Sequence, residues 1–250
     1  MGSPSVLLVV EGKITEKKLF EHFYSLYGLQ NASIVAYGST LYSMYNRMKK
    51  EYRLPSNPHK VDFESLDLVL FLNEHLKLDS EILLHEKDFT DIILIFDFDP
   101  QDPSYSPSIL EDMLLHFDDS TSSGKLFINY PMVESYKDFK SLHDPDFATS
   151  TVDALTLKTR HKDNNQYKAL VNARSFVNNW NQITKTVGNY IIKSKKEKIE
   201  SLLDMTHRTD IYRNFYTFQA NHFRQYDEVY IVNTSLLHLY DEYGLIATND

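Results

Sequence analysis

The sequence predicts an α/β fold in which a mostly parallel sheet, with helices on both faces, is followed by a helical C-terminal part. Two short apolar runs, residues 6–10 and 92–96, are typical of strands that are buried on both faces of a parallel sheet. Strand and helix patterns alternate up to about residue 146, as in repeated βαβ units. From about Phe147 the pattern changes to consecutive helices.

The first part of the chain begins with the strand at residues 6–10, which ends at Glu11 and Gly12. Thr15 is a good N-cap for a helix over residues 16–23. The other elements expected in this part are a strand at 32–37, helices at 41–53 and 65–77, a strand at 91–96, a helix at 109–117 and a strand at 125–130. We therefore expect a first domain over residues 5–146.

The second part, residues 147–250, is expected to be a mainly helical C-terminal extension that packs on the first domain. The elements expected there are helices at 167–181, 184–205 and 209–222, a strand at 229–232 and a last helix at 236–243. Asn233, Thr234 and Ser235 can cap the last helix, and Gly244 can end it.

Composition narrows the class of protein. The chain has 250 residues and no Cys, which excludes disulfides and thiolate metal sites. The apolar run at 6–10 is too short for a membrane span, so we expect a cytoplasmic protein with no membrane partner. The net charge of −9 is uneven, with 13 Lys and Arg against 24 Asp and Glu in residues 1–150, and 13 against 11 in residues 151–250. An acidic half beside a slightly basic half is compatible with a metal site beside a phosphate-binding surface.

Three carboxylates follow the two strongest strands. Glu11 ends the first strand, and Asp97 and Asp99 follow the second. In open α/β sheets ligands bind outside the carboxyl ends of the strands, so these acids are expected at one edge of the sheet. Two aspartates one residue apart on an extended segment point to the same side and can bind a hard cation. The sequence therefore predicts a site for Mg²⁺ or Mn²⁺.

Three segments of the first domain form a recognisable pattern. They are Val-Glu-Gly-Lys-Ile-Thr-Glu at 10–16, Asp-Phe-Asp at 97–99 and Asn-Tyr-Pro-Met-Val-Glu-Ser-Tyr at 129–136. The first two resemble the Toprim domain of topoisomerases, primases, related small ribonucleases and OLD-type nucleases, in a form closer to the OLD and RloB-like nucleases. The third resembles the Asn-Pro…Phe-Glu-X-Trp segment of RloB-like proteins, with Tyr130 inserted and Tyr136 in place of Trp. The resemblance covers residues 5–140.

The resemblance implies roles for five carboxylates. Glu11 would be a metal ligand or the general acid or base, and Asp97 and Asp99 would hold the metal. Glu16 and Glu134 would be supplementary ligands or would orient a metal-bound water. Glu16 is also explained as an acid in the first turn of a helix, and Glu134 as a capping carboxylate. Glu11 is harder to explain structurally, because an acid at the end of a buried strand is costly unless it is paired or metal-bound.

The basic residues of the second part are the candidates for contacts with nucleic acid. They are Lys158, Arg160, Lys162, Lys193, Lys195 and Lys196. OLD-type nucleases also use a lysine after the Toprim core to stabilise the transition state, and the resemblance leaves Lys158 and Lys162 as candidates for that role. The structural alternative is that these lysines form a solvated helix face.

The resemblance implies a divalent-metal-dependent endonuclease for DNA or RNA that serves as the effector of a bacterial anti-phage defence system. The resemblance also implies a separate ABC- or AAA-type ATPase as a partner, and the lack of a Gly-rich phosphate loop in the sequence is compatible with that. The alternative is a non-catalytic Toprim subunit that docks on such an ATPase and regulates it. The sequence does not choose between DNA and RNA, and it allows a homo-oligomer.

Overall fold

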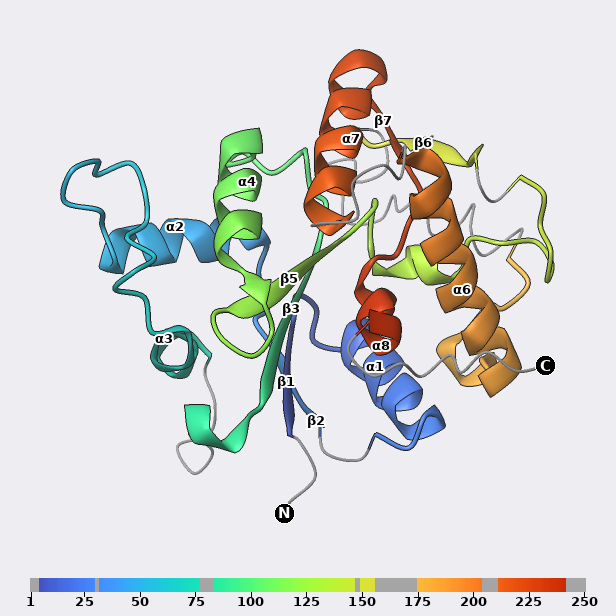
Figure 1. The fold of residues 1–250 in the computed structure, drawn as a ribbon, viewed down its shortest axis with the longest axis horizontal. Coiled ribbons are helices and arrows are strands. Elements are labelled where there is room, and N and C mark those ends of the chain that lie inside the picture. Colours follow the sequence, from blue (N-terminus) through green and yellow to red (C-terminus); the bar gives the residue numbers. More distant parts are fainter. Residues whose placement is uncertain are drawn as a thin grey trace. The chain divides into compact units, whose positions relative to one another are not determined.

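The computed structural model is an α/β fold with a five-stranded, mostly parallel sheet (Figure 1). It describes residues 5–29, 32–76, 83–146, 149–155, 175–203 and 211–241. Within these ranges no helix is long and apolar enough to cross a membrane. The predicted fold class is therefore confirmed as an α/β protein with a mostly parallel sheet.

The sheet has the strand order β2 (Ala32–Ala36), β1 (Val6–Val10), β3 (Asp91–Asp97), β5 (Gly124–Asn129) and β4 (Asp118–Asp119). β1 is parallel to both of its neighbours, so Val10 pairs with Ala36 on one side and with Ile95 on the other. β4 is antiparallel to β5. All five residues of β1 are buried, which explains why its sequence is an unbroken apolar run. Because β1 and β3 are parallel and in register, the residues that follow Val10 and Ile95 leave the sheet at the same edge.

The chain divides into two compact units, which are described separately. Unit 1 contains Met1–Glu21, Leu29–Phe96 and Asp102–Leu126, and unit 2 contains His22–Gly28, Asp97–Gln101 and Phe127–Asp250. Helix α1 (Thr15–Leu26) contributes residues to both units. The predicted domains, 5–146 and 147–250, are consecutive segments. The division into units does not test whether either segment folds alone, so that boundary stays a prediction.

Unit 1 contains the helices α2 (Leu41–Glu51), α3 (Leu68–His75) and α4 (Pro107–His116) and the 3-10 helix η1 (Glu86–Asp88). In Figure 1, α2, α3 and α4 all lie on the same side of β1 and β3. Thr40 caps α2 by accepting a hydrogen bond from the Ser43 N–H (3.3 Å). Phe71 of α3 packs against Tyr37, with 6.5 Å between ring centroids, and Tyr37 also contacts Phe96 of β3. This aromatic group joins α3 to the sheet.

Unit 2 contains η2 (Val133–Lys137), β6 (Thr151–Asp153), η4 (Trp180–Gln182), α6 (Lys185–Leu202), α7 (Ile211–Tyr226), β7 (Glu228–Tyr230), η5 (Ser235–Leu237) and α8 (His238–Asp241). β6 and β7 pair as an antiparallel ribbon. The Gln219 amide of α7 bonds to both backbone groups of Tyr230: its Nε2 donates to the carbonyl (2.8 Å), and its Oε1 accepts from the N–H (2.9 Å). The ribbon is thereby fixed to α7.

Most predicted elements of the described chain are confirmed, with ends that shift by up to three or four residues. The helix predicted at 167–181 is wrong over its described residues, 175–181. The chain there is irregular and then forms η4, because the side chain of Gln182 bonds back to the backbone N–H of Asn179 and closes a single turn. The strands β4 and β6 were not predicted.

Candidate functional site

Glu11 follows β1 and continues its hydrogen-bond pattern by one residue. Its N–H donates to the carbonyl of Ile95 (3.1 Å), and its carbonyl accepts from the N–H of Gly38 (2.9 Å). The backbone of Glu11 is therefore fixed between the ends of β3 and β2, and its side chain is half-buried. This is the edge of a parallel sheet at which ligands bind in α/β proteins.

Gly12 provides the space that the Glu16 side chain occupies. A Cβ built on Gly12 would lie 2.5 Å from Glu16 Cδ, closer than real Cβ atoms approach another heavy atom. Glu16 lies in the first turn of α1, where the helix dipole favours an acid, and its carboxylate folds back over the turn that follows β1. The structure therefore brings Glu16 against the turn that begins at Glu11.

Asp97 is the last residue of β3 and is only 8% exposed. Its Oδ1 accepts hydrogen bonds from the Val133 N–H (2.9 Å) and from Asn129 Nδ2 (3.4 Å). Asn129 is the last residue of β5 and is completely buried. Both donors act on one oxygen and hold it in place.

Asp99 and Glu134 are buried as well. Glu134 lies in η2 directly after Val133, so the hydrogen bond from Val133 to Asp97 joins the start of η2 to the end of β3. Burial, and then the charge of Glu134, raise the pKa of the Tyr136 phenol. Tyr136 is therefore neutral at any physiological pH.

Every charged side chain that is buried in the described ranges belongs to unit 2. The set consists of Asp97, Asp99, Glu134, Lys137, Asp138, Lys195 and Lys198. Burying an ionised group costs on the order of several kcal/mol unless the group is paired and hydrogen-bonded. Groups of buried ionisable residues are typical of functional sites, although structural ion-pair networks also produce them. Three of the five predicted site carboxylates belong to this set.

Lys195 and Lys198 lie one turn apart on α6, and both are buried. Burial lowers the pKa of Lys195 to about 7, against the opposing effect of Asp138 and Asp144. Burial also lowers the pKa of Lys198 to about 6, and the charge of Lys195 adds to this effect. Lys198 Nζ donates to the carbonyl (3.0 Å) and the hydroxyl (2.8 Å) of Ser150. Burial therefore favours the neutral form of both amines.

The burial of Lys195 corrects the sequence analysis at that position. Its side chain is 0% exposed, so it does not present an ammonium to a nucleic acid. The signal was present in the sequence, because Ile191, Lys195 and Ile199 are spaced four residues apart and share one face of the helix. Lys193, by contrast, is exposed and lies 3.9 Å from Glu197 on the same helix. A phosphate contact at Lys193 stays a prediction.

Lys196 is half-buried and forms an ion pair with Glu200. Its ammonium lies 5.0 Å from the centre of the Tyr240 ring. Lys196 also lines a cavity of about 510 Å³ together with residues of α6, α7, η5 and α8. Its contact with nucleic acid stays a prediction, and Lys158, Arg160 and Lys162 lie outside the described residues.

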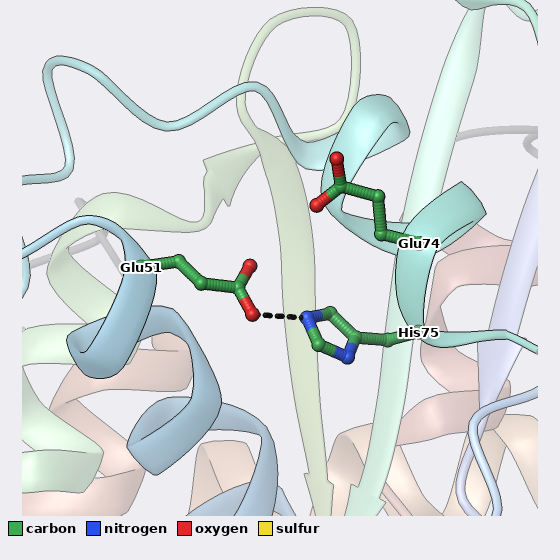
Figure 2. A group of neighbouring side chains, drawn as sticks. All are labelled: Glu51, Glu74 and His75. Atoms are coloured by element: carbon green, nitrogen blue, oxygen red, sulfur yellow. Dashed lines mark hydrogen bonds and ion pairs between the residues drawn. The ribbon is translucent and has the colours of Figure 1, made fainter.

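A group that sequence reasoning missed lies at the ends of α2 and α3. Ligand atoms of Glu51, Glu74 and His75 lie within 4.8 Å of one another, and no other such trio of acids or histidines occurs among the described residues. Figure 2 shows Glu51 and His75 facing each other, with 2.7 Å between Glu51 Oε1 and His75 Nε2. Both glutamates are exposed, and the hydrogen bond accounts for the approach of His75. The predicted site carboxylates are not part of this group.

This chain was compared with protein-family models, curated proteins and solved structures. None of them matches it. The chemistry of the site follows from its own residues. The carboxylates of Asp97, the last residue of β3, and of the nearby Asp99 are hard oxygen donors, which suit Mg²⁺ or Mn²⁺ rather than a soft metal.

Proposed function

We propose that this chain is a Mg²⁺- or Mn²⁺-dependent phosphodiesterase with a Toprim-like fold, an endonuclease that cuts DNA or RNA. The observation that carries the proposal is the burial of Asp97 and Asp99 at the point where β3 leaves the sheet. Glu11 follows the neighbouring parallel strand, whose last residue pairs with Ile95. Carboxylates at the ends of adjacent parallel strands supply the donors that a hard cation needs.

In this proposal Asp97, Asp99 and Glu11 hold the metal, and Glu16 and Glu134 are supplementary ligands or orient water. Bound divalent ions supply an activated water and charge stabilisation for the leaving oxygen of a phosphodiester. The hydrogen bonds from Val133 and Asn129 keep the Asp97 carboxylate in one orientation, so little reorganisation accompanies metal binding.

We further propose that the chain acts as the effector of a bacterial anti-phage defence system beside a separate ABC- or AAA-type ATPase. The support is the Toprim resemblance of residues 5–140, and the lack of a Gly-rich phosphate loop in the sequence is compatible with it. A purified candidate ATPase, added to the cleavage assay described next, tests this part of the proposal.

The test is a Mg²⁺ and Mn²⁺ titration of the full chain with mixed DNA and RNA substrates, with and without the ATPase. Asp97→Ala and Glu11→Ala are each expected to abolish metal-dependent cleavage and to leave the circular-dichroism spectrum intact. Asp91→Asn is the matched control, because Asp91 begins the same strand at its other end and accepts from the Ser120 hydroxyl (2.8 Å). Unchanged cleavage by Asp97→Ala or Glu11→Ala would refute the proposal.

A non-catalytic subunit that docks on the ATPase and regulates it is the second candidate. It is favoured by the finding that, in the described part of the chain, the one close trio of metal-ligand atoms lies at Glu51, Glu74 and His75. If this candidate is right, no metal or partner produces cleavage, and the ATPase rate changes when the chain is added.

A further inference from the structure

A closed ring of hydrogen bonds connects Asp97 to the segment that follows β7. Asp97 Oδ1 accepts from the Val133 N–H (2.9 Å) and from Asn129 Nδ2 (3.4 Å). Asn233 Nδ2 donates to the Val133 carbonyl (2.7 Å), and Asn233 Oδ1 accepts from the Ser235 hydroxyl (2.8 Å). The Ser235 N–H donates to Asn129 Oδ1 (3.2 Å) and closes the ring.

All members of the ring are buried. Asn129, Asn233 and Ser235 are each 0% exposed, and Val133 is 1% exposed. In a low dielectric each of these bonds is stronger than in water, and a group that loses its partner costs more. Each asparagine donates through its amide nitrogen and accepts through its amide oxygen. A leucine of similar size could neither donate nor accept a hydrogen bond, and an ionised aspartate could only accept one.

The segment after β7 has further anchors that do not pass through the ring. Tyr130 and Val232 exchange two backbone hydrogen bonds of 2.8 Å. The Thr234 hydroxyl donates to the Ile128 carbonyl (2.6 Å). These bonds already hold the segment against β5. The segment therefore has anchors besides the two asparagines. Asn129 bonds to Asp97 directly, and Asn233 is connected to it through Val133.

We propose that Asn129 and Asn233 are positioning residues that hold the Asp97 carboxylate in the orientation that a divalent cation requires. The inference rests on the proposed metal-dependent function. Asn129 acts on the carboxylate directly, and Asn233 acts through the peptide group of Val133. Outer hydrogen bonds to metal-binding carboxylates typically change metal affinity by about 10- to 100-fold when they are removed.

The test uses the full chain and Mn²⁺ alone, with binding followed by electron paramagnetic resonance. Asn233 Oδ1 also accepts from the Leu236 N–H (3.2 Å). The test variants are Asn233→Ser, whose shorter hydroxyl keeps an acceptor for Leu236 but lacks the amide nitrogen that donates to Val133, and Asn129→Leu. We expect both variants to bind Mn²⁺ about 10- to 100-fold more weakly. Thr234→Val is the matched control, because it loses a buried hydrogen bond of the same segment outside the ring. Its affinity should stay within about twofold, since it leaves every ring bond in place.

A second readout does not depend on metal. Amide exchange at Val133 in the metal-free protein should become at least about tenfold faster in Asn233→Ser, relative to the reference amide of Val232, because local exchange reports the lost restraint. Wild-type affinity and unchanged exchange at Val133 in both test variants would overturn the inference and leave the proposed function standing. If wild type and Asp97→Ala bind Mn²⁺ equally, the proposed function fails, and the inference fails with it.

Discussion

Lys195→Met is expected to stabilise the protein below pH 7. Lys195 is completely buried, and its pKa falls from 10.5 to about 7, a difference of about 3.5. At about 1.4 kcal/mol for each pKa unit, the folded state disfavours the protonated amine by about 5 kcal/mol. The attraction of Asp138 and Asp144 is already included in that pKa. Methionine keeps most of the length of the side chain and removes the charge.

The sign of the pH dependence follows from the direction of the shift. Because the pKa of Lys195 is lower in the folded state, the unfolded state binds more protons between about pH 7 and pH 10.5. Stability therefore rises with pH in this window. The gain from Lys195→Met should be largest at pH 6, up to about 5 kcal/mol, and should shrink towards pH 10. The variant should still become somewhat more stable as the pH rises, because the pKa of Lys198 is also lowered, to about 6.

Urea unfolding at pH 6, 8 and 9.5, for example, measures this effect. Lys193→Met is the matched control, since it makes the same substitution on the same helix at an exposed side chain. We expect the control to stay within about 0.5 kcal/mol of wild type at every pH. If Lys195→Met is less stable than wild type at pH 6, the buried amine is charged and is stabilised by its acidic neighbours, and the reasoning is refuted.

Further substitutions test two glycines with positive φ, the turn after β1 and the N-cap of α2. Gly124→Ala should lower the free energy of unfolding by about 2 kcal/mol and Gly28→Ala by about 1 kcal/mol. Both glycines have a positive φ, but of the two only Gly124 has a close neighbour at the position of a Cβ, Leu68 Cδ2 at 3.3 Å. Equal urea midpoints for the two variants would contradict this expectation. Gly12→Ala should displace the Glu16 carboxylate and weaken Mn²⁺ binding as much as Glu16→Gln does. The double variant should bind Mn²⁺ no more weakly than either single variant, and a further loss would contradict this explanation. Thr40→Val should cost about 1 to 2 kcal/mol, because Thr40 accepts from Ser43 and donates to Asp102 (2.7 Å), whereas Thr40→Ser should melt near wild type.

The sequence was sufficient for elements that carry a pattern of their own. β1 is an unbroken apolar run, and α2 and α4 have apolar positions at helical spacing, so their types followed from periodicity. β6 has three residues, and its partner β7 follows more than 70 residues later. A strand of three residues forms only because it pairs with another strand, so its own sequence does not predict it. The helix prediction for residues 175–181 was wrong because the side chains of Asn179 and Gln182 bond to the backbone and form a single 3-10 turn there. These bonds outweigh the helical spacing of the apolar residues in the sequence.

Some residues of the candidate site could be predicted from the sequence, and others could not. Sequence reasoning placed Glu11 directly after one strand and Asp97 at the end of another, and both are found there. Asn233 was expected only as a helix cap, which it is, since its Oδ1 accepts from the Leu236 N–H (3.2 Å). Its other bond reaches Val133, 100 residues earlier in the chain, and no spacing rule predicts such a contact.

The buried charges bear on the choice between the two candidate functions. A buried ion pair can often be replaced by apolar residues without loss of stability, so folding alone gives little reason to retain one. The buried amines of Lys195 and Lys198 differ from such a pair, because burial lowers the pKa of each more than Asp138 and Asp144 raise it. Asp97 accepts hydrogen bonds from two neutral donors, Val133 N–H and Asn129 Nδ2, which hold its Oδ1 in place. The catalytic candidate requires that Mn²⁺ binding is lost in Asp97→Ala, whereas the regulatory candidate does not. Metal binding at Asp97 should therefore be tested before partner binding.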